Sequence, residues 1–307
     1  MNKNDLLEKN YNGLLVVRAK NALFNAGFDG LPRTLPDGTI FATDKALKYC
    51  LREYLNNFEE NSKVFVKRNR HLKKKEYVYE TLAENYWDKT GEELKNETTD
   101  EDIIKKLKEF IDIRLFGIVF SPKKPNKNIS FTGPVQISYG INKLQNAQPY
   151  SCDILSPYAP EKDEKKKDPN KKEKAQTTLG NESRVDEVFY VYDISVNKNN
   201  ARGTNGTGML QKDLDPLKKA LMNGPDLITS TTKFGVESSA LIWLENQDNK
   251  NFNNLSDYVS ISKINDQTII DASKLKKHLE GQGIQENSVE KKVKREDIEI
   301  RWNNNGK

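Results

Sequence analysis

The chain has few apolar residues and no long hydrophobic run. Apolar side chains make up 35% of its 307 residues, and adding the 17 glycines leaves the total below the usual range of about 45–50%. Charged residues reach 31%, a surplus that predicts long solvated loops or insertions around a modest core. The best apolar stretches, residues 14–17 and 188–192, have the length of strands and exclude a membrane span.

Cysteine and histidine are also scarce. The two cysteines, Cys50 and Cys152, cannot form a disulfide framework, and their separation matches no zinc-binding spacing. Acidic residues at the start of the chain replace the apolar region of a signal peptide, so we expect a cytoplasmic protein. Only His71 and His278 are present, which makes a histidine-based acid and base pair hard to build.

The common catalytic motifs are missing as well. The sequence has no GxxxxGK[ST] phosphate loop, no GxSxG elbow and no HExxH, and the glycines of residues 203–208 lack the context of a dinucleotide site. Asp29, Asp37 and Asp44 could bind a divalent cation, but turn aspartates and a helix cap are the favoured interpretation. Nothing in the sequence requires an enzyme or a cofactor.

Positive charge is concentrated in one place. Residues 63–75 contain seven lysines and arginines and no acid, mixed with aromatic and β-branched residues, whereas the whole chain has a net charge of only +5. A second charged stretch, residues 161–174, carries seven lysines and five acids without an apolar side chain. Such a segment cannot bury enough surface to offset its ordering entropy, so we predict a disordered loop tip.

A glycine-rich loop precedes a predicted helix. Residues 13–18 form an apolar run typical of a buried strand, and residues 19–38 contain enough glycine and proline to predict a shaped loop. From Thr43 to Phe58 the apolar residues follow a helical period, and Thr43 or Asp44 is placed to cap the first turn. Lys45, Lys48 and Arg52 share one stripe of this helix beside the loop, where phosphate binding or simply a solvated face would explain them.

The remaining patterns predict an α+β fold. Strands are expected at 111–120, 129–141, 188–196 and 239–245, with helices at 102–110 and around Leu214 to Leu221. A further apolar stretch at 258–264, a helix at 271–280 and a strand at 298–302 follow. Without the insertions at 59–110 and 142–187, the order is strand, helix, strand, strand, helix, strand. That order is the ferredoxin-like or RRM arrangement, an antiparallel sheet with helices on one face.

Particular residues then resemble a known family. Residues 21–55, with Pro32-Arg33, Thr43-Asp44, Lys48 and Arg52, resemble the opening of the repeated backbone subunit of type I CRISPR interference complexes (Cascade), in the RAMP superfamily. The DIRLFG of residues 112–117 and the TGPVQISYG of residues 132–140 match its paired central strands. The return strand of its thumb resembles residues 179–192, and residues 235–245 fit the type I-B branch best. The family usually has a denser Asn-Pro-Asn-Gly loop where this chain has AKNALFNAG.

The resemblance implies a division of the chain into palm, finger and thumb. The RRM-like palm would comprise residues 11–58, 111–141 and 188–250, the finger residues 59–110, and the thumb hairpin residues 142–187 with its disordered tip at 161–174. Residues 251–307 would be a C-terminal extension. Copies of such a subunit would polymerise along a CRISPR guide RNA without catalysing a reaction and without a cofactor.

The implied partners are the CRISPR RNA, neighbouring copies of the chain, target DNA and other Cascade subunits (the cap subunit, the large subunit and the guide-processing endonuclease), but no membrane. A subunit that coats RNA without reading its sequence needs cations and backbone amides along the phosphates. The expected RNA-binding residues are Arg18, Lys20, Asn21, Arg33, Thr43, Lys45, Lys48, Arg52, Arg68, Arg70, Gln136 and Arg184.

Two other readings stay open. A backbone ribonuclease like that of type III complexes would cut matched RNA with a loop aspartate, Asp29 or Asp37. A guide-processing endoribonuclease of the same RRM family is disfavoured, because the glycine-rich region contains no histidine.

Overall fold

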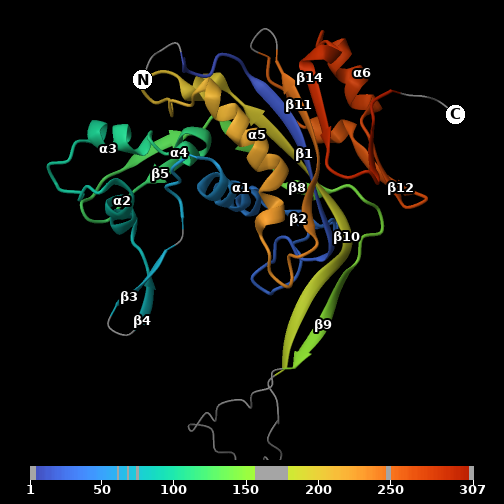
Figure 1. The fold of residues 1–307 in the computed structure, drawn as a ribbon, viewed down its shortest axis with the longest axis horizontal. Helices are drawn as coiled ribbons and strands as arrows, with labels where there is room; N and C mark the ends of the chain where they lie inside the picture. Colours follow the sequence, from blue (N-terminus) through green and yellow to red (C-terminus); the bar gives the residue numbers. More distant parts are fainter. Residues whose placement is uncertain are drawn as a thin grey trace, which may run out of the picture.

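A computed structural model describes residues 5–60, 62–67, 69–73, 76–155, 179–246 and 250–303. Helices pack against antiparallel sheets in it, so the mixed α+β architecture expected from the sequence is confirmed (Figure 1). None of the helices in these ranges combines the length and apolar content that a membrane span requires.

The main sheet has the strand order β14-β11-β1-β10-β8-β2, and β7 and β9 also pair with β10. All of these pairings are antiparallel. β1 therefore lies between β11 and β10 near the middle of the sheet. The strands are β1 (Tyr11–Ala22), β2 (Phe41–Ala42), β7 (Val135–Ile137), β8 (Gly140–Asn142), β9 (Pro149–Leu155), β10 (Leu179–Val196), β11 (Val236–Glu245) and β14 (Val289–Val293).

Two long helices cover one face of this sheet (Figure 1). Leu15 and Val17 of β1 belong to the same core as Leu47 of α1 (Asp44–Phe58) and Leu217 of α5 (Leu214–Asn223). Both helices follow the periodicity predicted for them. The predicted N-cap is also confirmed, because the Thr43 side chain accepts a hydrogen bond from the backbone N–H of Ala46.

The C-terminal segment covers the opposite face. Leu14 and Val16 of β1, which alternate with Leu15 and Val17, pack against residues from this segment such as Ile270 and Leu275. The segment contains a three-stranded sheet in which β13 pairs antiparallel with β12 and parallel with β15. Its elements are β12 (Ser260–Ile264), β13 (Gln267–Asp271), α6 (Ser273–Gly281) and β15 (Ile298–Arg301). The central strand β1 of the main sheet is thus buried on both faces from Tyr11 to Ala19.

A third core lies beside the main sheet. Phe65, Tyr86, Ile103 and Phe120 are buried together in it. It is built by the short hairpin β5–β6 and three helices, α2, α3 and α4, and the hairpin β3–β4 projects next to it (Figure 1). The elements are β3 (Arg70–Lys73), β4 (Glu76–Tyr79), α2 (Leu82–Thr90), α3 (Asp100–Leu107), α4 (Ile111–Phe116), β5 (Gly117–Phe120) and β6 (Ile129–Thr132).

The prediction of a strand over the whole of 111–120 is wrong. Residues 111–116 form helix α4, and only Gly117–Phe120 form a strand. The helix lies between two cores: Ile111 and Leu115, one turn apart, face the main core, whereas Ile113 faces the third core. Apolar and charged residues alternate over 111–115, which is the pattern typical of a strand, but here Asp112 and Arg114 form ion pairs with Arg52 and Asp213 inside the protein.

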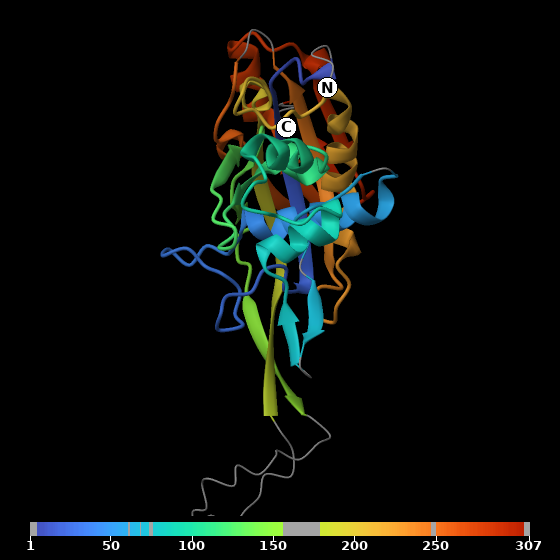
Figure 2. The same cartoon turned by 90° about the vertical axis from the view of Figure 1, so that its left-hand side faces the viewer.

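The predicted thumb begins as a two-stranded ribbon. The first half of β10, from Leu179 to Val185, pairs with β9, and the rest of β10 continues into the main sheet beside β1. The ribbon projects beyond the sheet in both views (Figures 1 and 2). The predicted disordered tip at 161–174 lies outside the described residues.

Candidate nucleic-acid interface

Two tandem turns shape the loop between β1 and β2. In the first turn, the backbone N–H of Gly27 donates to the oxygen of Leu31, and that of Gly30 donates to the oxygen of Gly27. The second turn repeats this pattern, with bonds from Leu35 to Thr39 and from Gly38 to Leu35. Both glycines, Gly30 and Gly38, have positive φ, which favours glycine. In both turns an aspartate carboxylate accepts a hydrogen bond from the backbone N–H two residues later. Asp29 accepts from Leu31 at 3.0 Å, and Asp37 accepts from Thr39 at 2.9 Å.

These bonds assign Asp29 and Asp37 a structural role, as the turn interpretation predicted. The hydrogen bond from the Thr39 backbone lowers the pKa of Asp37, so its carboxylate stays ionised and engaged in the turn. Among the residues that the structure describes, no group of three or more histidine, cysteine, aspartate or glutamate side chains is placed to hold a metal ion.

The first turn presents an apolar tip that the sequence analysis missed. Phe28 is fully exposed and Leu31 is half-exposed. The neighbouring loop before β11 carries Phe234, which is 84% exposed, and the backbone bonds from Lys20 to Gly235 and from Leu23 to Thr232 tie this loop to the end of β1. Two exposed phenylalanines therefore lie on loops that follow or contact the end of β1. Each is a single aromatic residue within a turn, where no periodic pattern reveals it.

The loop is anchored to the start of α1. The side-chain oxygen of Asn25 accepts hydrogen bonds from the backbone N–H and the hydroxyl of Thr43, at 2.9 and 3.0 Å. The Thr43 hydroxyl also caps the helix, so this predicted RNA-binding side chain already holds the loop and the helix together.

The α1 cations do not all lie on the solvated face, and that part of the prediction is wrong. The Lys45 side chain is 81% exposed, but those of Lys48 and Arg52 are only 15% and 17% exposed. The Lys48 amino group and the Arg52 guanidinium lie over the ring of Phe116 in α4, 5.6 and 5.2 Å from its centroid. The stripe therefore divides into one exposed lysine and two cations packed between helices.

Arg52 is part of a buried network. Its Nε donates to the fully buried carboxylate of Asp112 at 3.1 Å, and the backbone N–H groups of Phe65 and Val66 donate to the same carboxylate at 2.8 and 3.0 Å. Asp112 thus joins α1, α4 and the chain that leads to β3.

Arg18 is more deeply buried than Arg52. Its side chain is 5% exposed and contacts Glu187 at 2.5 Å and Glu237 at 3.1 Å, and Lys263 also pairs with Glu187. Burial alone would raise the pKa of Glu187, but the hydrogen bonds and charges of Lys263 and Arg18 outweigh it and lower that pKa. Alternation along β1 places Arg18 on the face that the C-terminal segment covers. Its partners are therefore carboxylates within the protein.

Lys20, Asn21 and Arg184 meet where the ribbon leaves the sheet. Lys20 and Asn21 are exposed at the end of β1, and Asn21 has a positive φ of 50°. The Arg184 guanidinium donates to the backbone oxygen of Asn21 at 2.7 Å and pairs with Glu182. The structure thus brings these three predicted residues together.

The other predicted residues are more dispersed. Arg33 is half-buried, and its Nε donates to the Ala26 oxygen at 3.1 Å across the base of the first turn. Gln136 is exposed, but Val135 and Ile137 on either side face the core under α1, so alternation points Gln136 to the opposite face of the sheet. Arg68 and the side chain of Arg70 lie outside the described part of the structure.

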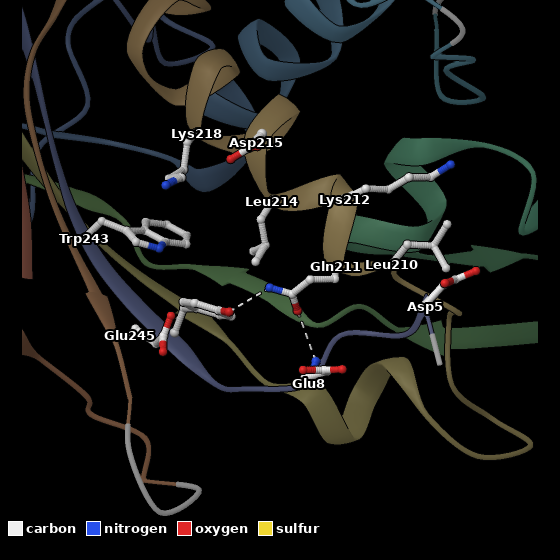
Figure 3. Close-up of a pocket in the computed structure, with 11 residues that line it drawn as sticks. Asp5, Glu8, Leu210, Gln211, Lys212, Leu214, Asp215, Lys218, Trp243 and Glu245 are labelled. Carbon is white, nitrogen blue, oxygen red and sulfur yellow. Dashed lines mark hydrogen bonds between the residues drawn. The ribbon is translucent and has the colours of Figure 1, made fainter. Parts of the chain in front are cut away.

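A cavity of about 740 Å³ opens at the start of β1, beside α5. In it Gln211 accepts from the backbone of Glu8 and donates to the hydroxyl of Tyr11 (Figure 3). The charged lining residues are four acids and two lysines: Asp5, Glu8, Asp215, Glu245, Lys212 and Lys218. Carboxylates outnumber cations in this lining, which disfavours the binding of phosphate in this cavity.

Comparisons with known proteins agree with the resemblance. The model of one protein family, described as CRISPR-associated protein Cas7, matches residues 9–280. None of the curated proteins matches the chain. Among solved structures, a chain of a "CRISPR RNA-guided surveillance complex, pre-nicking" is similar with 12% identity, coverage of 81% of both chains and a TM-score of 0.49. A chain of another "CRISPR RNA-guided surveillance complex" is 10% identical, with 94% of both chains covered and a TM-score of 0.45.

The family match begins two residues before β1 and ends within α6, and it includes the tandem turns, α1 and the ribbon. The chain belongs to the Cas7 family of CRISPR-associated proteins.

Proposed function

We propose that the chain is a non-catalytic backbone subunit that binds CRISPR RNA and polymerises along it in a type I Cascade complex of the cytoplasm. The observation that carries this proposal is the Cas7 family match over residues 9–280. The other partners would be the cap subunit, the large subunit, the guide-processing endonuclease and target DNA.

The order of the strands supports an RRM-like palm. β11, β1, β10 and then β7 and β8 lie side by side, all antiparallel, with α1 between β1 and β7 in the chain and α5 between β10 and β11. This is the spatial order 4-1-3-2 of a βαββαβ unit. An RRM binds RNA on the sheet face opposite its helices, but the C-terminal segment covers that face here. The RNA path that we propose therefore crosses the end of the sheet.

Cations and exposed apolar side chains are available at that end. Lys20 and Lys45 are exposed there, and the partly buried Arg33 and Arg184 lie at the base of the first turn and at the base of the ribbon. Cations at such positions suit phosphates, and exposed aromatic side chains such as Phe28 and Phe234 suit bases of any identity. The ribbon adds Ile154 and Leu155, which are exposed near the end of its described part and could contact RNA or a neighbouring copy.

The proposal is tested by titrating single-stranded RNA with the full chain at several salt concentrations. Each neutralised phosphate should add about −0.7 to the slope of log K against log salt, and two strands of equal length and unrelated sequence should bind equally. Lys45→Gln should make this slope less steep by about 0.7, the contribution of one phosphate. Lys277→Gln, at an exposed lysine of α6, should not. Strong sequence preference, or RNA cut during incubation with magnesium, would contradict the proposal.

A further inference from the structure

An apolar groove lies beside the third core, away from the end of β1. It has a volume of about 570 Å³ and is lined by the chain before β3, the end of β4, the start of α2, and β5. These elements can be located in Figure 1. We call it the side groove. Its walls include Phe65, Val66, Tyr79, Leu82, Ile118 and Val119. Its volume is within the range of about 300–1,000 Å³ typical of small-molecule sites.

The apolar walls of the side groove are open to solvent. Val66, Tyr79 and Val119 are 42%, 49% and 69% exposed. These residues come from three separate segments of the chain, so the fold brings together three apolar side chains that local structure alone would not place side by side. Apolar exposure gathered in a concave site indicates a binding surface.

One polar atom interrupts this apolar lining. Asn85, which also lines the side groove, is 8% exposed, and its Nδ2 donates to the backbone oxygen of Phe65 at 3.1 Å. Its Oδ1 is buried and accepts no hydrogen bond from any described residue. A buried acceptor without a partner is rare, and it favours a ligand that carries an N–H or O–H group.

One cation lines the side groove. It is Lys67, which belongs to a segment, residues 63–75, whose sequence has seven cations and no acid. The one carboxylate of the lining, Glu80, accepts a hydrogen bond from Asn69 at 3.2 Å. Lys67 is therefore the lining residue that suits an anionic group.

We propose that the side groove holds one unstacked nucleobase of a single-stranded nucleic acid, an inference that rests on the proposed function. A base offers flat apolar faces to Val66, Tyr79 and Val119, and each of the four bases has an edge N–H that could donate to Asn85 Oδ1 once the amide adjusts. The adjoining phosphate suits Lys67. An apolar side chain of a neighbouring copy would fill the walls but would leave the acceptor without a partner.

The experiment uses the full chain and a short single-stranded RNA of about eight nucleotides, within the range of site sizes known for single-strand binding. Val119→Gln removes an apolar wall without adding charge, and Val293→Gln, at a half-exposed valine of β14, is the matched control. Val119→Gln should weaken binding by about fivefold at every salt concentration, the low end of the loss of one stacking contact. Lys67→Gln should instead flatten the salt slope by about 0.7.

Photocrosslinking provides the second readout. An RNA with 4-thiouridine in place of uridine should crosslink to peptides that contain residues 65–85 or 118–119, and less so in Val119→Gln. If wild-type chain binds RNA with the expected salt slope, but Val119→Gln binds equally well and no crosslink maps to these peptides, the nucleobase proposal is overturned while the proposed function stands. If Val119→Gln reduces self-association without RNA and leaves short-strand binding unchanged, the groove holds a neighbouring protein and the proposal is also overturned. A wild-type chain that binds no RNA would overturn both proposals.

Discussion

Replacing Arg52 with glutamine should destabilise the fold, although Arg52 is on the helix stripe that resembles a phosphate-binding surface. Asp112 is fully buried, and Arg52 is the one cation among its three observed hydrogen-bond donors. Breaking a buried ion pair by removing one partner costs about 3–5 kcal/mol. Two backbone N–H groups still solvate the carboxylate and Arg52 keeps some solvent contact, so we expect a loss of about 2–3 kcal/mol in the free energy of unfolding.

Urea denaturation followed by tryptophan fluorescence measures this loss. Lys45→Gln is the matched control on the same helix, and it should leave the urea midpoint unchanged because the Lys45 side chain is 81% exposed. Asp112→Asn in the Arg52→Gln background should recover part of the stability, since the uncharged amide no longer requires a cation. An Arg52→Gln chain as stable as wild type, or strictly additive effects in this double-mutant cycle, would refute the assignment of Arg52 to the internal network.

Three further predictions concern the core. The pKa of Glu187 in the folded chain is below its ordinary value of 4.5, so the ionised carboxylate stabilises the fold at pH values above 4.5. This stabilisation is lost as the pH falls from 4.5 through the pKa of the folded state. Thermal unfolding of wild type and Glu187→Gln between pH 7 and pH 3 checks this, since the variant should show a weaker acid dependence, and parallel curves would contradict it. A β-carbon at Gly140 would lie 2.4 Å from the ring of the buried Tyr192, so Gly140→Ala should cost about 1–3 kcal/mol in a urea titration. The control Gly281→Ala meets no atom within 4 Å and should cost nothing. Burial raises the pKa of the Cys50 thiol to about 12. A thiol reagent at pH 8 should therefore react with the exposed Cys152 alone in the folded chain and with both cysteines in urea. Two fast-reacting thiols in the folded chain would be inconsistent with the core described above.

The sequence predicts the local features of the fold well. α1 and its Thr43 cap follow from apolar spacing within one segment, and the turn roles of Asp29 and Asp37 follow from the neighbouring glycines. α4 could not be identified in the same way. Asp112 and Arg114 alternate with apolar residues as in a strand, and Ile111 and Ile113 face different cores.

The candidate site depends more on contacts between distant segments. Lys48 and Arg52 lie on the polar side of their own helix, and their burial comes from Phe116 and Asp112, about sixty residues further along the chain. The position of Arg18 at the end of an apolar run already indicates that it is buried, but its partners Glu187 and Glu237 belong to the distant strands β10 and β11. The side groove likewise combines three segments and has no signature in any one of them.

The most direct test of the account is the number of chains bound per RNA as the RNA is lengthened. Native mass spectrometry of the full chain with guide-length strands, in magnesium and with two unrelated sequences at each length, gives both the stoichiometry and the mass of the RNA. A non-catalytic subunit that polymerises along RNA predicts one more chain for each fixed increment of length, equal numbers on both sequences, and RNA of unchanged mass. A stoichiometry that does not change with length, or RNA shortened at regular intervals, would contradict it.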